Sequence, residues 1–74
     1  MRIDTIDKMY IVGELKQRGI TVLLEELDDL KDDLAPFAKG QLDYRNQNGG
    51  FSEKEKPYAQ MMAEYFNLPA ETVQ

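Results

Sequence analysis

Apolar residues recur at helical spacing along most of the chain, most regularly between residues 21 and 37. Five of them follow alternating steps of four and three: Leu23, Leu27, Leu30, Leu34 and Phe37. These steps place the side chains on one side of a helix. Thr21 can cap its start, and Pro36 should end or bend it, because proline disfavours helical geometry in the residue before it. The pattern predicts one helix over residues 21–35 and a second, short helix over residues 36–45.

The first part of the chain predicts a helix over residues 5–18. Asp4 can cap its first amides, and Gly19 suits the left-handed conformation that often ends a helix. Its apolar residues wrap most of the way round, which indicates burial between neighbours or a second face offered to a partner. A β-hairpin is the alternative, because the β-branched residues of this segment also favour strands. We prefer the helix because of the signals at its ends.

The last part of the chain predicts a longer helix and a short one. Ser52 and Glu55 have the spacing of a capping box. Pro57 lies beyond the first turn of a helix begun at Ser52, so we expect either a bent start or a start at Pro57. Asn67 tolerates the left-handed conformation that a tight turn requires, and Pro69 can begin a second helix.

Together these segments predict a single all-α domain over residues 1–74. We expect a small bundle of four to five short helices, near residues 5–18, 21–35, 36–45, 53–67 and 69–74. A chain this short buries a small share of its surface and often gains stability by self-association. We therefore expect the bundle to associate with itself, as a homodimer.

The composition narrows the class of protein. The 74 residues include no cysteine and no histidine, and the net charge is −5. Disulfides and common zinc sites are thereby excluded. Because histidine and cysteine are absent and Ser52 is the only serine, we expect no enzyme and no cofactor. The negative charge opposes binding to nucleic acid or anionic lipid. With no stretch of membrane-spanning length and with acids near the N-terminus, a cytoplasmic location is expected.

Residues 59–74 resemble a helix-turn-helix in their spacing. Ala63 matches the small residue of the first helix, and Asn67 stands at the turn. No lysine or arginine occurs from Pro57 to the end, although cations supply most of the affinity for DNA phosphates. A DNA-binding transcriptional regulator is therefore the alternative hypothesis, and we interpret the corner first as a packing feature.

Residues 44–55 partly match the spacing of an EF-hand calcium loop. Asn46, Asn48, Gly49 and Glu55 fall at its third, fifth, sixth and twelfth positions. Tyr44 occupies the first position, where calcium requires an acidic ligand. A glycine-rich turn before a capped helix explains the same residues, so weak calcium binding is a minor alternative.

The acidic residues between the leucines form either a solvated helix face or a surface for a basic partner, including one that imitates nucleic acid. Our leading hypothesis is a small acidic protein–protein interaction module that acts as a regulator, inhibitor or assembly accessory. It would bind another protein, itself, or both, with no small-molecule substrate. The expected contact residues are apolar at the centre and acidic at the rim: Leu23, Leu27, Leu30, Leu34, Asp28 and Asp32.

Overall fold

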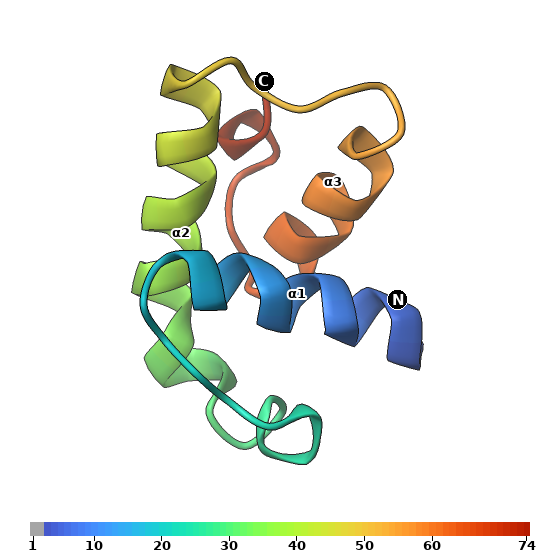
Figure 1. Cartoon of the computed structure of the whole chain (residues 1–74), viewed down its shortest axis with the longest axis vertical. Coiled ribbons are helices and arrows are strands. Elements are labelled where there is room, and N and C mark those ends of the chain that lie inside the picture. Colours follow the sequence, from blue (N-terminus) through green and yellow to red (C-terminus); the bar gives the residue numbers. More distant parts are fainter. Residues whose placement is uncertain (1–2) are drawn as a thin grey trace.

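The computed structural model describes residues 3–74, and the regular structure within them is helical. It comprises three α-helices, α1 (Thr5–Gln17), α2 (Lys31–Gln47) and α3 (Lys56–Tyr65), and two 3₁₀ turns, η1 (Leu24–Glu26) and η2 (Ala70–Thr72). In Figure 1, α1 crosses the front of the molecule, with α2 and α3 behind it. The all-α class is confirmed, but the expected four to five helices are not. The alternative β-hairpin is wrong, because its first segment forms α1.

All three α-helices end on a residue in the left-handed conformation. Gly19 follows α1 with a φ of 86°, Gly49 follows α2 with 105°, and Asn67 follows α3 with 57°. After α3, Leu68 donates its N–H to the carbonyl of Ala63 at 2.8 Å. This arrangement satisfies a free carbonyl and folds an apolar residue back onto the last turn. The helix ends predicted at Gly19 and Asn67 are confirmed.

The start of α1 follows the sequence signals, whereas α3 begins at Lys56, close to the alternative start at Pro57 and not at residue 53. Asp4 accepts the N–H of Asp7 at 2.9 Å, and Asp7 accepts that of Asp4 at 3.3 Å. Before α3, the hydroxyl of Ser52 accepts the N–H of Glu55 at 3.3 Å. The helix itself begins one residue before Pro57. In the first turn of a helix the backbone N–H groups have no partner within the helix. The N–H that Pro57 lacks therefore costs α3 no hydrogen bond.

The helix predicted over residues 21–35 is wrong. Residues 24–26 form only η1, and the chain turns before α2 begins. The sequence contains a physical reason: acidic residues lie four apart at 25 and 29, 28 and 32, and 29 and 33. Like charges at this spacing destabilise a helix. The turn redirects the chain, so that α2 runs past one end of α1 (Figure 1).

The boundary predicted between residues 35 and 36 is also wrong, because α2 continues through Pro36. Proline removes one hydrogen bond of the helix ladder, at a cost of about 3 kcal/mol in a helix interior. Packing opposes this cost: Leu34 is 6% exposed, and Ala38 and Leu42 are fully buried. These residues share the core face of α2, so the predicted segment 36–45 is part of one helix with the residues before it.

The core lies where the three α-helices meet. Ile11 and Leu15 of α1, Leu42 of α2 and Met62 of α3 are all fully buried. Each such side chain stabilises the fold by roughly 1.5–3 kcal/mol relative to an exposed one. Leu27 is equally buried, although it follows η1 and belongs to no α-helix. It therefore fixes the segment between α1 and α2 to the bundle.

The helix predicted over residues 69–74 is reduced to the three-residue turn η2. Thr72 is 7% exposed, and its carbonyl accepts a hydrogen bond from the Asn46 side chain of α2. This hydrogen bond fastens η2 to α2. No helix within residues 3–74 has the length and apolar character needed to cross a membrane.

Candidate functional site

The four leucines predicted to bind a partner are divided between the core and the surface. Leu27 and Leu34 are core residues, with exposed fractions of 0% and 6%. Leu30 is half-buried, and Leu23 is 56% exposed. They do not form one stripe, because the segment that carries them bends between η1 and α2. A partner can reach Leu23, but it can reach Leu27 and Leu34 only by opening the core.

Asp28, one of the two predicted acidic contacts, is exposed but engaged within the chain. Its carboxylate accepts a hydrogen bond from the Tyr65 hydroxyl at 2.5 Å and pairs with the Lys8 ammonium at 3.0 Å. The Tyr65 hydrogen bond, followed by that of Lys8, lowers the pKa of Asp28 below its ordinary value. Asp28 therefore links the turn after η1 to both α1 and α3.

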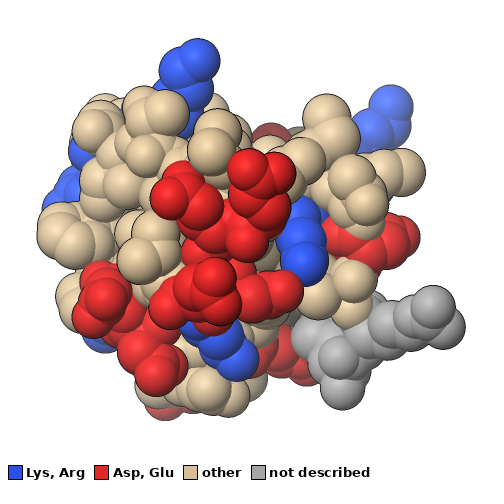
Figure 2. All heavy atoms as spheres, turned by 90° about the horizontal axis from the view of Figure 1, so that it is seen from below, with Lys and Arg blue, Asp and Glu red and all other residues tan. Residues whose placement is uncertain are grey.

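Six carboxylates around this turn form what we call the acidic end: Glu25, Glu26, Asp28, Asp29, Asp32 and Asp33. Figure 2 faces this part of the molecule and shows acidic side chains gathered there. Within residues 3–74, the five members other than Asp28 make no ion pair. Lys31 lies among them in the sequence, but its ammonium stands over the Tyr65 ring, 5.0 Å from the ring centre. The acidic end therefore carries uncompensated negative charge, which attracts cationic groups.

Exposed apolar side chains occur beside these acids. Leu23 is 56% exposed and Leu24 is 37% exposed, and both immediately precede Glu25 in the chain. Asp32, the second predicted acidic contact, lies exposed in the first turn of α2. Leu23, before η1, and Asp32, in α2, are thus each accessible, and so is Leu24, which the leucine spacing did not indicate.

A second charged cluster, which we call the buried cluster, surrounds the buried carboxylate of Glu14, and the sequence did not reveal it. Arg45 of α2 donates two hydrogen bonds of 3.0 Å to the two carboxylate oxygens of Glu14. It also donates one of 2.5 Å to Glu55, and its guanidinium lies 4.7 Å from the centre of the Phe51 ring. These contacts join α1, α2 and the turn before α3. A signal was present: Glu14 lies three residues after Ile11, on the buried face of α1.

The buried cluster contains two groups with raised pKa values. Glu14 is 3% exposed, and this burial raises the pKa of its carboxyl, while the charge of Arg45 opposes the rise. Burial, followed by the charge of Glu14, raises the pKa of the Tyr10 hydroxyl. That hydroxyl is buried and has no hydrogen-bond partner among the described residues. The Tyr10 ring stacks on that of Tyr58 with 5.4 Å between centres, so Tyr10 joins α1 to α3.

The side chains of the EF-hand-like loop are engaged elsewhere. Asn46 donates to the carbonyl of Thr72, and Asn48 donates to the carbonyl of Tyr44 at 2.8 Å. Glu55, the expected bidentate ligand, pairs with Arg45. Within residues 3–74, no three histidine, cysteine, aspartate or glutamate side chains are grouped to hold a metal ion. The loop residues thus fasten α2 to its neighbours.

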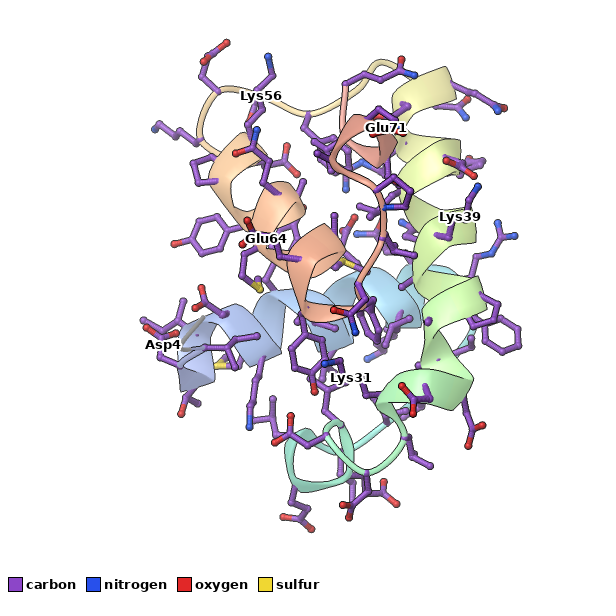
Figure 3. The ribbon with its side chains drawn as sticks, turned by 180° about the vertical axis from the view of Figure 1, so that it is seen from behind. Asp4, Lys31, Lys39, Lys56, Glu64 and Glu71 are labelled. Atoms are coloured by element: carbon purple, nitrogen blue, oxygen red, sulfur yellow. The ribbon has the colours of Figure 1, made fainter. Side chains whose placement is uncertain are left out.

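The C-terminal corner has the turn of a helix-turn-helix but not its second helix. Asn67 supplies the turn, and η2 replaces the reading helix. The labelled acidic side chains of this region, Glu64 and Glu71, belong to α3 and η2 (Figure 3), and both are exposed. A hollow of about 180 Å³ separates the two limbs. It is smaller than the roughly 300 Å³ at which small-molecule sites begin.

Comparisons with known proteins give no relative from which a function could be carried over. No protein-family model matches the chain, and neither a curated protein nor a solved structure matches it. The functional argument therefore depends on the chain's own geometry.

Proposed function

We propose that this chain is a small, non-catalytic interaction module that binds a basic surface of another protein through its acidic end. One observation carries the proposal: five carboxylates without an ion pair within residues 3–74 lie on a segment that the core holds in place. A stable fold gains nothing from crowding like charges. Their concentration is explained when a positively charged partner neutralises them.

The fixed position of this segment supports the proposal. Leu27 anchors it in the core, and Asp28 connects it to Lys8 and Tyr65. The carboxylate of Glu26 also accepts the N–H of Leu23 at 3.2 Å, which closes the turn of η1. A surface that is already ordered loses less conformational entropy on binding than a flexible acidic tail does. The acidic end is therefore prepared to bind.

The apolar contact of this interface is narrower than the leucine spacing suggested. Leu23 and Leu24 are exposed beside the acids, whereas Leu27 and Leu34 support them from inside. An apolar centre with a charged rim is the usual composition of a protein interface. We propose a partner that offers lysine or arginine side chains around an apolar contact. A regulator, an inhibitor or an assembly accessory could all act in this way.

The decisive experiment is affinity capture with two matched double variants. Glu25→Gln with Asp29→Asn removes two charges from the acidic end, and Glu53→Gln with Glu71→Gln removes two exposed charges elsewhere. We expect the unmodified chain and the second variant to retain the same proteins at low salt. We expect the first variant to lose them, and moderate salt to release them.

Two further readouts refine the result. Release of the captured proteins by duplex DNA would identify the partner as a nucleic-acid-binding protein and the acidic end as its mimic. Equal retention by both variants, or release that does not depend on salt, would contradict the proposal. Circular dichroism of each variant confirms that the fold is kept, which is expected because all four replaced side chains are exposed.

A further inference from the structure

A hollow of about 410 Å³ lies where the end of α1 meets α2, and we call it the Arg18 hollow. In Figure 1 this end of α1 lies across the middle of α2, and the two helices are in contact. The volume falls within the roughly 300–1,000 Å³ of small-molecule sites. The described residues that line the hollow all carry hydrogen-bonding groups, and no carboxylate is among them: Gln17, Arg18, Gln41 and Tyr44.

The guanidinium of Arg18 lies directly against α2 at Gly40. A Cβ atom on Gly40 would lie 2.9 Å from Nη2, 3.2 Å from Cζ and 3.4 Å from Nε of Arg18. Glycine destabilises a helix relative to alanine, so the room for the guanidinium comes at a cost to α2. Arg18 is exposed, and it makes no ion pair with another residue of the described chain. Its N–H donors are therefore held beside the hollow and remain open to an acceptor.

Two glutamines supply a further donor. Gln41 is 2% exposed and donates its side-chain N–H to Oε1 of Gln17 at 3.1 Å. Gln41 also hydrogen-bonds to the carboxyl of Glu14. An ionised carboxyl can only accept, so Gln41 meets both neighbours as a donor. Because the oxygen of the Gln17 amide accepts from Gln41, the group that Gln17 can offer to a ligand is its N–H donor.

Tyr44 gives the hollow an aromatic side. It is 53% exposed, and its contact with Asn48 uses the backbone carbonyl and leaves the ring and hydroxyl free. An exposed ring favours contact with an apolar or aromatic group of a ligand. The hollow therefore combines one cation, neutral donors and a ring.

We infer that the Arg18 hollow binds a small monocarboxylate, with the carboxylate on Arg18 and the body of the ligand against the ring of Tyr44. A guanidinium matches a carboxylate with two parallel hydrogen bonds, which are stronger than those between neutral groups. A single cation neutralises a single negative charge, whereas a phosphate group carries up to two. The net charge of −5 repels anions at longer range, so we expect a dissociation constant on the order of 1 mM.

Benzoate is a suitable probe, and heteronuclear NMR of the full chain measures its binding. We expect saturable shifts in the signals of Gln17, Arg18, Gln41 and Tyr44. Benzamide has the same ring and no charge, so it should bind about tenfold more weakly or not at all. Equal binding of benzamide would contradict the role of Arg18. Tighter binding of inorganic phosphate than of benzoate would show that the site takes phosphate, and the assignment to a carboxylate would be wrong.

Two matched variants separate a specific contact from general attraction. Arg18→Met should weaken benzoate binding about tenfold or more, because the charged hydrogen bonds are lost. Lys16→Met removes the same charge from an exposed residue of α1 that does not line the hollow, and it should leave the affinity within about twofold. Equal losses in both variants would mean that benzoate responds only to net charge, and this would overturn the inference.

Gly40→Ala tests the position of the guanidinium. The added Cβ must displace the end of Arg18, so benzoate should bind several-fold more weakly. The melting temperature should not fall, because alanine favours the helix and meets only a flexible side chain. Unchanged affinity would contradict the site. The double variant Glu25→Gln with Asp29→Asn should bind benzoate as the unmodified chain does, so this inference and the proposed function fail or hold independently.

Discussion

The carboxylates of the buried cluster and of the acidic end differ in their exposure and in their pairing. Glu14 is 3% exposed, and Arg45 satisfies both of its oxygens. Glu25 and Asp29 are exposed, and neither makes an ion pair within residues 3–74. A buried charge must be paired, because burial removes the water that stabilised it. An exposed charge needs no partner for stability, so it is available for binding.

This difference predicts where a substitution acts. Changes in the buried cluster should reduce stability, because α1, α2 and the turn before α3 meet at Arg45. Changes to the five carboxylates of the acidic end other than Asp28 should leave stability nearly unchanged and act on association with a partner. The following predictions test this separation, from the largest expected effect on stability to the smallest.

Arg45→Met should be the most damaging charge removal. It leaves Glu14 buried without its partner, which typically costs about 3 kcal/mol or more. That is a large part of the stability of a chain this size, for which about 0.05–0.15 kcal/mol per residue is usual. Chemical denaturation measures the loss. Lys39→Met is the matched control, because Lys39 pairs with Asp43 on the surface, where ion pairs contribute about 0–1 kcal/mol. Equal losses in the free energy of unfolding for Arg45→Met and Lys39→Met would contradict the distinction between buried and exposed charges.

Glu14→Gln should change the response to acid. The raised pKa of Glu14 means that its protonated form favours the fold, so this contribution is lost as pH rises through the folded-state value. The pKa values of Asp28 and Glu55 are lowered, mainly by hydrogen bonds from Tyr65 and Arg45. Their contributions are present at neutral pH and are lost as pH falls below about 4. In the Glu14→Gln variant, acidification removes the contributions of Asp28 and Glu55, and no gain from protonation of Glu14 offsets that loss.

Thermal melts between pH 7 and pH 3 test the prediction. The Glu14→Gln variant should lose stability more steeply on acidification than the unmodified chain. Glu71→Gln is a suitable control, because Glu71 is exposed and should leave the slope unchanged. If melting temperature changed with pH in the same way in all three proteins, protonation of Glu14 would not offset the stability lost at Asp28 and Glu55, and the prediction would be wrong.

The double variant Glu25→Gln with Asp29→Asn should have the smallest effect on stability. Removing two neighbouring negative charges relieves repulsion, so stability should stay equal or rise by a few tenths of a kcal/mol at low salt. Added salt should abolish even this difference, because it screens exposed charges. Melting curves at two salt concentrations measure the effect. A loss comparable to that of Arg45→Met would mean that the acidic end holds the fold together.

Both ends of α1 and the C-terminal end of α3 could be predicted from the sequence because they depend on local chemistry. Asp4 caps α1, Gly19 and Asn67 adopt the left-handed conformation, and Ser52 closes the turn before α3. Each signal involves residues within a few positions of one another. The prediction of one helix over residues 21–35 was wrong because it used the leucine spacing alone. It left out the repulsion between acidic residues four apart, and it did not include the burial of Leu27 in the core.

The candidate surface was predicted only in part for a related reason. Leu23 and Asp32 are exposed as a binding surface requires, but Leu27 and Leu34 are buried. Periodicity identifies apolar residues that share a side of a helix, and it does not say whether the core or a partner covers them. Here the chain bends after η1, so the four leucines meet different surroundings.

The sequence by itself determined the helical class, both ends of α1, the C-terminal end of α3 and the net charge, since these follow from residue types and short spacings. The tertiary structure alone decided that Arg45 joins Glu14 to Glu55, residues separated by 31 and 10 positions from it. It also decided that Leu27 enters the core while Ile6 and Met9 remain exposed. These outcomes depend on how α1, α2 and α3 cross. Such crossings arise from packing between segments distant in the chain, which no local pattern encodes.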